Sequence, residues 1–367
     1  MNQTSYQSVN PVEEDQIASG ISDPADAEPA DLIDMQTISD HDAQDLALAQ
    51  EPVTLKITVV GDCTLGTDDS FDYASSLNAF YYEYGPSYFL QNVKDIFSAD
   101  DLTIANAESV FTESNDRADR IFAFKSPAEF AKIYTEGSVE AVNVANNHAH
   151  DYGDQGLEDK KAALDAEGVV HFGYSETAMM EIKGVKVGLV GTYILIDFWD
   201  CEDELRENIQ KLKEEGADLI ISIFHWGNEL DLEPDEYQLA FGKMAVDAGA
   251  DLVCGHHPHV IQGIETYKGK TIAYSLANFC FGGNVYPTDM DTFIFQQSFT
   301  IDENGAVPGE VNIIPCSCSS EYGYNNYQPT PATGEDAARI MRKLNERTSE
   351  LPISENTTTT TYTYTES

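Results

Sequence analysis

The sequence predicts a layered α/β fold, with central β-sheets flanked by helices and a site at the carboxyl ends of strands. Three observations lead to this prediction. Short apolar runs rich in β-branched residues recur through the middle of the chain, amphipathic segments separate them, and polar side chains follow the runs. Alternating strand and helix patterns are typical of layered α/β proteins. Ligands of open α/β sheets bind at the carboxyl ends of the strands.

The elements follow from these patterns in chain order. The first strand covers residues 55–61 (LKITVVG) and ends in a turn glycine. Two of the amphipathic segments stop at Gly168 and Gly249, the usual residue after a helix. Three later runs follow one another with only turns between them, so we expect antiparallel strands that complete a sheet. The other expected strands are 102–106, 139–146, 185–191, 219–226 and 251–257, the helices are 127–136, 154–167, 202–215 and 235–248, and the later runs are 259–267, 270–279 and 291–301.

Composition divides the chain into four parts. Residues 1–52 are acidic, contain no Lys or Arg and lack any sustained period, which predicts a disordered acidic linker. Residues 53–316 form the main domain, and residues 317–352 are expected to be an exposed loop and a C-terminal helix. The Thr-rich residues 353–367 are expected to be a disordered tail. Such flanks favour an extracellular or cell-surface protein whose signal or anchor has been removed, with a cytoplasmic location as the alternative.

Charge and cysteine content exclude several classes of protein. The 367 residues include 64 Asp and Glu but only 20 Lys and Arg, a net charge of -44. This balance argues against nucleic-acid binding, which needs cations to neutralise phosphates. No apolar run reaches the ~18 residues of a transmembrane helix. The six cysteines include no CxxC pair, so a zinc ribbon is unsupported and buried thiols are expected.

Residues that can bind metals come directly after five of the expected strands. Any one of them alone is explained by a turn or a helix cap. Together they are more informative, because four of the eight histidines and two carboxylates meet at one sheet edge. Carboxylate, imidazole and amide ligands suit Mn, Fe, Zn or Mg, and their number fits two divalent ions that share a carboxylate. The residues are Asp62, Glu108, Asn147, His148, His225, His257 and His259.

The motifs that carry these residues resemble a known family. ITVVGD, NAESVFT, VNVANNHAHDYGDQGL, HWGNE, AGADLVCGHHPHVIQGIE and IAYSLANF occur in order between about residues 55 and 315. Together they resemble the bacterial CapA-type capsule-synthesis family, associated with poly-γ-glutamate. Members of that family resemble the calcineurin-like metallophosphoesterases, and the resemblance implies a metallophosphoesterase-like version of the layered α/β fold.

The resemblance implies a role for each site residue. Asp62, Glu108, Asn147, His225, His257 and His259 would hold the two metals, with Glu108 as the bridging carboxylate. His148 would be the general acid rather than a ligand. Thr64 stands where many metallophosphoesterases have a His ligand, and Ala277 stands where glycine is usual. Substrate or supporting roles are expected for Asn106, Asn146, Asp151, Trp226, Glu229, His256 and Asn278, with Lys125 a weaker candidate.

The implied function is metal-assisted hydrolysis of a phosphoester or a γ-glutamyl amide, in which the ions activate a water and His148 protonates the leaving group. The alternative is a non-hydrolytic component that binds the polymer through bridging metal for capsule assembly, export or attachment. Expected partners are an anionic polymer or a small phosphorylated or glutamyl substrate, together with capsule-synthesis membrane proteins. A family tied to a pathway does not by itself define a reaction.

Overall fold

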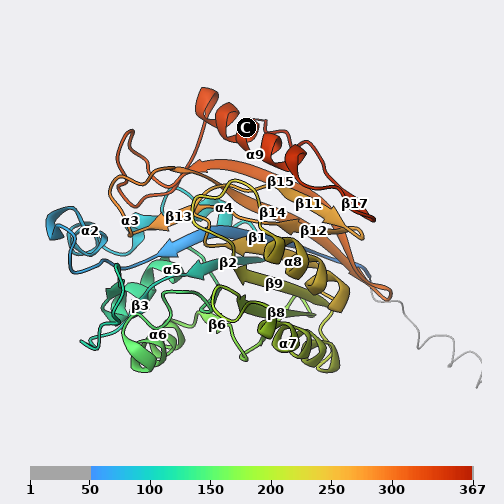
Figure 1. The fold of residues 1–367 in the computed structure, drawn as a ribbon, viewed down its shortest axis with the longest axis horizontal. Helices are drawn as coiled ribbons and strands as arrows, with labels where there is room; N and C mark the ends of the chain where they lie inside the picture. The colour runs from blue at the N-terminus through green and yellow to red at the C-terminus, as the bar shows by residue number, and fades with distance from the viewer. Residues whose placement is uncertain (1–50, 366–367) are drawn as a thin grey trace, which may run out of the picture. The chain divides into compact units, whose positions relative to one another are not determined.

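Two large β-sheets form the centre of the domain (Figure 1), which the computed structural model describes over residues 51–365. The first sheet has 8 strands and the second has 7. The first contains β1 (Val53–Thr64), β2 (Leu102–Ala107), β5 (Ala141–Asn143), β6 (Val170–Phe172), β13 (Asn278–Phe281), β14 (Asp291–Asp302), β15 (Gly305–Ser317) and β16 (Thr330–Pro331). The second contains β7 (Ala178–Ile182), β8 (Val185–Tyr193), β9 (Leu219–His225), β10 (Leu252–His256), β11 (Ile264–Tyr267), β12 (Lys270–Ala273) and β17 (Thr357–Thr358).

The main hydrophobic core lies between the two sheets. Leu55, Ile57 and Val59 of β1 share one buried cluster with Leu219 and Ile221 of β9. The strands that carry the site run parallel within each sheet, β1 with β2 and β5 in the first, and β8 with β9 and β10 in the second. Their carboxyl ends therefore meet at one edge of the two-sheet core.

Helices cover the outer faces of both sheets. Buried side chains of α3, α5 and α6 pack on the first sheet, and those of α7 and α8 pack on the second. Helix α9 lies along β15 (Figure 1) and adds Ile340 and Leu344 to the core between the sheets. The helices are α2 (Leu77–Tyr84), α3 (Ser87–Leu90), α4 (Lys94–Phe97), α5 (Lys132–Glu136), α6 (Gly153–Glu167), α7 (Glu202–Glu214), α8 (Glu236–Ala248) and α9 (Gly334–Glu350). Short 3-10 turns cover Tyr73–Ser75, Ala128–Ala131 and Phe198–Cys201, and β3 (Val110–Phe111) pairs with β4 (Lys125–Ser126).

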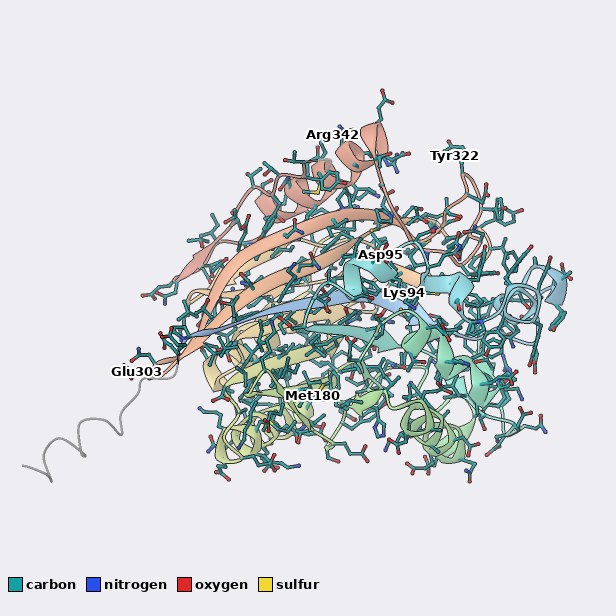
Figure 2. All side chains as sticks on the ribbon, turned by 180° about the vertical axis from the view of Figure 1, so that it is seen from behind. Lys94, Asp95, Met180, Glu303, Tyr322 and Arg342 are labelled. Atoms are coloured by element: carbon teal, nitrogen blue, oxygen red, sulfur yellow. The ribbon has the colours of Figure 1, made fainter. Side chains whose placement is uncertain are left out.

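The β14–β15 hairpin runs along the first sheet. In Figure 2, Glu303 at the hairpin turn and Tyr322 in the loop after β15 lie toward opposite ends of the domain. Strand β14 pairs antiparallel with β1 from Val53 to Val59, so it flanks the strand that leads to the site.

The layered α/β class is confirmed, and so are most of the expected elements. Two of the expected elements are shorter or less regular than their patterns indicated. The helix expected at 127–136 begins as a 3-10 turn before α5, and only Ala141–Asn143 of the 139–146 run is strand. The three late runs do not complete one sheet, because β11 and β12 join the second sheet while β13 and β14 return to the first. Strand β13 is also parallel to β1, not antiparallel.

The C-terminal helix expected within residues 317–352 is present as α9, whereas part of the Thr-rich segment expected to be a disordered tail has regular contacts. Residues 51–365 belong to one compact unit, which includes α9. After α9, Thr357–Thr358 pairs with β11, and the backbone N–H and carbonyl of Tyr362 both bond the Asn345 side chain. A low-complexity composition did not prevent these residues from finding strand and helix partners. The acidic linker expected at 1–52 lies almost wholly outside the described residues.

Two further expectations can be compared with residues 51–365. All six cysteines are buried and free, which agrees with their interpretation as buried thiols. Over the described part of the chain, no helix combines the length and the apolar character needed to cross a membrane.

Candidate metal centre

The candidate ligands come from the carboxyl ends of both sheets. Asp62 lies near the end of β1, and Glu108 follows β2 directly. Asn147 lies in the loop after β5, also in the first sheet. The second sheet contributes His225 at the end of β9. It also contributes His257 and His259, from the loop after β10, so the centre lies where the two sheets meet.

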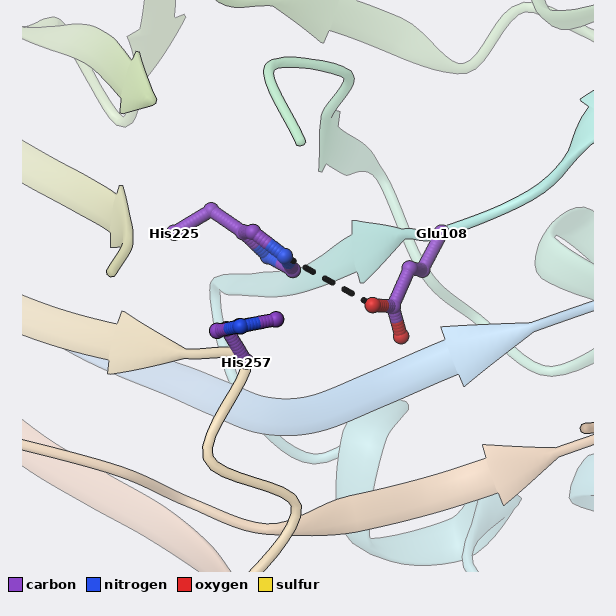
Figure 3. A group of neighbouring side chains, drawn as sticks. All are labelled: Glu108, His225 and His257. Atoms are coloured by element: carbon purple, nitrogen blue, oxygen red, sulfur yellow. Dashed lines mark ion pairs between the residues drawn. The ribbon is translucent and has the colours of Figure 1, made fainter. Parts of the chain in front are cut away.

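Glu108 belongs to two groups of residues that can hold metals. One group is Glu108, His225 and His257 (Figure 3), and the other is Asp62, Glu108 and His259. Within each group the ligand atoms lie within 4.8 Å of one another. The Oε1 atom of Glu108 lies 3.6 Å from His225 Nε2 and 3.8 Å from His259 Nε2. A single carboxylate oxygen thus faces both groups, so Glu108 would be the residue that two ions could share.

Two buried atoms of this set have no hydrogen-bond partner among the described residues. They are Oε1 of Glu108 and Nδ1 of His257. A buried polar atom without a partner costs about 1–3 kcal/mol, and such atoms are rare in folded proteins. A divalent cation would accept the lone pairs of both. The oxygen and imidazole donors therefore fit metal ions, and their chemistry suits Mn, Fe, Zn or Mg.

Asn147 supplies an amide oxygen on the His225 side of the centre. Its Oδ1 lies 2.9 Å from His225 Nε2, the same nitrogen that faces Glu108. The structure therefore brings together all six side chains that the sequence analysis expected to bind metal. Glu229 extends the set, because it forms a third metal-capable group with His257 and His259.

The electrostatics of the centre favour different forms of its imidazoles: His259, which lies against both carboxylates, favours the charged form, whereas His225 and His257 favour the neutral form. Burial raises the pKa of Glu108 to about 8, and the nearby charge of Asp62 adds to the effect. Burial opposes ionisation of Asp62, but its hydrogen bonds with His259 and Asn106, together with the charges of the neighbouring histidines, outweigh burial and lower the pKa. Against burial, Glu108 and Asp62 raise the pKa of His259 to about 10. Burial lowers the pKa of His257 to about 3 and that of His225 well below its usual value.

A network of amides and a hydroxyl holds the carboxylates in place. Asn106 donates from Nδ2 to Asp62 Oδ1 over 2.8 Å, and its own Oδ1 accepts from Asn143 Nδ2 over 2.9 Å. Thr64 donates to Glu108 Oε2 over 3.1 Å. Many metallophosphoesterases have a His ligand at the position of Thr64. In this chain Thr64 instead orients the Glu108 carboxylate. Such supporting hydrogen bonds strengthen metal binding.

A buried lysine supports the same strand end. Lys160 of α6 is fully buried and donates to the Ala107 carbonyl, which also accepts from Asn146 Nδ2 over 2.8 Å. The peptide before Glu108 is therefore held from two sides. Neither Lys160 nor Asn143 was predicted from the sequence to support the site. Asn143 had a signal, as a polar residue inside an apolar run, whereas Lys160 looks like any lysine of an amphipathic helix.

His148 is oriented by Asp151. The Nδ1 atom of His148 lies 2.7 Å from Asp151 Oδ2. The same carboxylate accepts from the Phe124 N–H over 2.6 Å and pairs with Arg120. Burial lowers the pKa of His148, against the opposing effect of Asp151. Asp151 therefore fixes the imidazole, which lines the cavity above the centre.

The loops that carry the ligands contain strained backbone. His257 and His259 have φ values of 95° and 56°, and Ala277 has φ of 63°. Non-glycine residues in this region cost of order 1–3 kcal/mol each and cluster at functional sites. The value at Ala277 explains why glycine suits that position. Gly61 is needed for close approach, since a Cβ there would lie 2.0 Å from the Ala277 carbonyl oxygen.

Three residues with expected supporting or substrate roles occupy structural positions. Trp226 is a core residue rather than a substrate wall: it is fully buried, stacks on Phe224 at 4.3 Å and donates to the Tyr274 carbonyl. His256 lies between backbone carbonyls, with Nε2 2.9 Å from Val60 O. Lys125 bonds the Ser114 carbonyl and does not line the cavity.

A cavity of about 290 Å³ opens over the centre. Glu108 and His259 lie at its base, and His148 lines its wall. Glu229 and Asn278 also line it, as expected for residues near substrate. Asn278 additionally places its Oδ1 2.9 Å from His259 Nδ1, so it supports the centre as well.

Comparison with known proteins shows which family the chain matches. Residues 56–283 match the family model for the bacterial capsule synthesis protein PGA_cap. The capsule biosynthesis protein CapA of Bacillus anthracis is 28% identical over 82% of this chain and 75% of its own length. The PGA biosynthesis protein CapA of Bacillus subtilis is 33% identical over 54% of this chain, which spans little more than half, 57%, of that relative.

Solved structures are less similar. A phosphatase from Mycoplasma pneumoniae has a TM-score of 0.46 at 15% identity, covering 72% of this chain and 94% of the phosphatase. A similarity at this level supports no statement about chemistry.

Proposed function

The chain belongs to the bacterial capsule synthesis family PGA_cap, and from this membership we propose that it acts in poly-γ-glutamate capsule synthesis as a metal-dependent hydrolase. The proposed centre holds two divalent ions between Asp62, Glu108, Asn147, His225, His257 and His259. The proposed reaction is cleavage of a phosphoester or a γ-glutamyl amide. Capsule-synthesis membrane proteins are the proposed partners, and the cell surface is the proposed location.

The observation that carries this proposal is the position of Glu108. Its Oε1 atom faces His225 on one side and His259 on the other, is buried, and has no hydrogen-bond partner among residues 51–365. A buried carboxylate oxygen with a purely structural role would normally be hydrogen-bonded. A carboxylate shared by two ions would explain both its location and the absence of a hydrogen bond to Oε1 among the described residues.

The chain's own residues supply orientation and proton transfer. When bound, two divalent ions lower the pKa of a water and polarise the oxygen of the bond to be cleaved. His148 donates a proton to the leaving group, a role that histidine side chains commonly fill in general acid catalysis. Asp151 holds Nδ1 of His148, which fixes the ring for that transfer. Thr64 and Asn106 hold the two carboxylates.

Metal content tests the proposal directly. Protein purified without chelator is expected to carry about two divalent ions per chain, and the Asp62→Ala/His257→Ala variant is expected to lose them. The control is Asp69→Ala/His150→Ala, which removes the same residue types from exposed positions. The parent protein and the control variant, which keep their metal, should both hydrolyse at least one compound in a screen of phosphoesters and γ-glutamyl amides. Absence of metal in the parent protein would refute the proposal.

A polymer-binding assay on the same proteins, beside the turnover screen, separates hydrolysis from polymer binding without cleavage. Binding of poly-γ-glutamate that needs metal but not His148, with no turnover of any ester or amide, would replace the hydrolase by a binding component. The location is tested separately, by cell fractionation with an antibody against this chain.

A further inference from the structure

One wall of the cavity over the centre is built from aromatic rings. Phe71 lies 5.6 Å from Phe122 and 6.2 Å from Phe124, centroid to centroid, and Phe122 stacks on Phe124 at 6.3 Å. All three line the cavity. The wall reaches the reacting side of the site, since the Phe124 ring lies 4.7 Å from the ring of His148.

The outer part of this wall is exposed. Phe122 is 46% exposed, and Leu230, which also lines the cavity, is 50% exposed. Both side chains could bury more apolar surface against a ligand, at roughly 25 cal/mol for each Å². Their position at the cavity, rather than their exposure alone, distinguishes them from apolar residues scattered on the surface.

The charged residues of the cavity are acidic. Among residues 51–365, no Lys or Arg side chain lines it, whereas Glu229 and Asp289 do. Lys343 pairs with Asp289 at 2.7 Å, which leaves Glu229 as the exposed carboxylate of the rim. A ligand with several free carboxylates would meet the like charge of Glu229 at the rim and no lysine or arginine countercharge among the described residues that line the cavity.

We propose that the Phe71–Phe122–Phe124 wall binds an uncharged, apolar or aromatic group attached next to the bond that is cleaved. The substrate of the cavity is then an ester or amide with an apolar neighbour, rather than an internal stretch of a polyanion. This inference rests on the proposed hydrolytic centre and specifies its substrate class. The metals would bind the phosphoryl or acyl group, and the aromatic wall would bind the apolar group attached to it.

Phosphonates test this inference through binding rather than turnover. Calorimetry on the Mn-loaded protein is expected to show phenylphosphonate binding about tenfold tighter than methylphosphonate, from the apolar area buried. The preference should fall to less than about threefold in Phe122→Ala and persist in Tyr84→Ala, a control at an exposed aromatic of α2 that does not line the cavity.

A charged phosphonate tests the expected discrimination against carboxylates. 2-Carboxyethylphosphonate, which adds one carboxylate, is expected to bind more weakly than propylphosphonate of similar size. Equal affinities for the phenyl and methyl compounds, or tighter binding of the carboxylate compound, would overturn the aromatic-wall inference. If no phosphonate binds any Mn-treated sample, the metal centre itself fails, which is a different outcome from binding without preference.

Discussion

Replacing Lys160 by methionine should stabilise the metal-free protein near neutral pH. Lys160 is fully buried, and burial lowers the pKa of its ammonium from 10.5 to about 7. The unfolded chain binds this proton up to pH 10.5, whereas the folded chain releases it near pH 7. The charged form therefore opposes folding below pH 7, and the free energy of unfolding rises with pH between 7 and 10.5.

The size of the effect follows from that window. At about 1.4 kcal/mol per pH unit, the buried charge costs about 5 kcal/mol of stability at pH 6. The variant removes this cost, but it also loses the hydrogen bond to the Ala107 carbonyl, which lowers the gain in stability by about 2 kcal/mol. Asn146 still bonds that carbonyl, so it is not left without a partner. We expect Lys160→Met to gain roughly 3 kcal/mol at pH 6, and the gain to vanish by pH 10.

Urea unfolding at pH 6 and pH 10, with metal removed, measures this difference. The control is Lys161→Met, whose lysine forms ion pairs with Glu158 and Glu176 near the surface and should change stability by less than about 1 kcal/mol. The same Lys160 variant should bind metal at least about tenfold more weakly, because the peptide before Glu108 loses a support. A variant less stable than its parent at pH 6 would refute the reasoning.

Three further predictions test other parts of the structure. Asp151→Asn should lower kcat by about 10². It should also move the basic limb of the pH–rate profile to lower pH, because Asp151 raises the pKa of His148. An unchanged pH–rate profile would contradict this role of Asp151. Trp226→Phe should cost about 1–3 kcal/mol in urea unfolding, from the lost bond to Tyr274, with no change in substrate preference if Trp226 is a core residue. Removal of residues 353–367 should lower the free energy of unfolding by about 2 kcal/mol, by loss of β17 and the Asn345 contacts, whereas a disordered tail would leave it unchanged.

The sequence was most informative about strand ends. Parallel strands place their carboxyl ends at one edge, so the position of a polar residue directly after an apolar run, such as Glu108 after β2, can be predicted from the pattern. The pairing of strands across the two sheets was harder to foresee. Runs 259–301 looked like consecutive strands of one sheet, but β13 returns to lie beside β1, a long-range contact that local pattern does not encode.

Residues whose role depends on tertiary neighbours could not be assigned from sequence. Trp226 directly follows the candidate ligand His225, and the sequence left both core packing and a substrate wall open for it; the structure packs it in the core against Phe224. Alternate residues of a strand face opposite sides, which is the reason that neighbours of a ligand often belong to the core. Lys160 is a comparable case, because only packing shows that it is buried beneath β2.

Bound metal would link the two sheets of the domain, because the proposed ligands are divided between them. A chain segment that has formed only the first sheet holds Asp62, Glu108 and Asn147, and a segment with only the second holds the three histidines. Neither half can bind ions as the complete set does, so tight binding becomes available only after the sheets have docked. Ions at 100 times their dissociation constant would add about 2.7 kcal/mol to the unfolding free energy. Metal supply would thereby determine how long the assembled domain persists, as well as its chemistry.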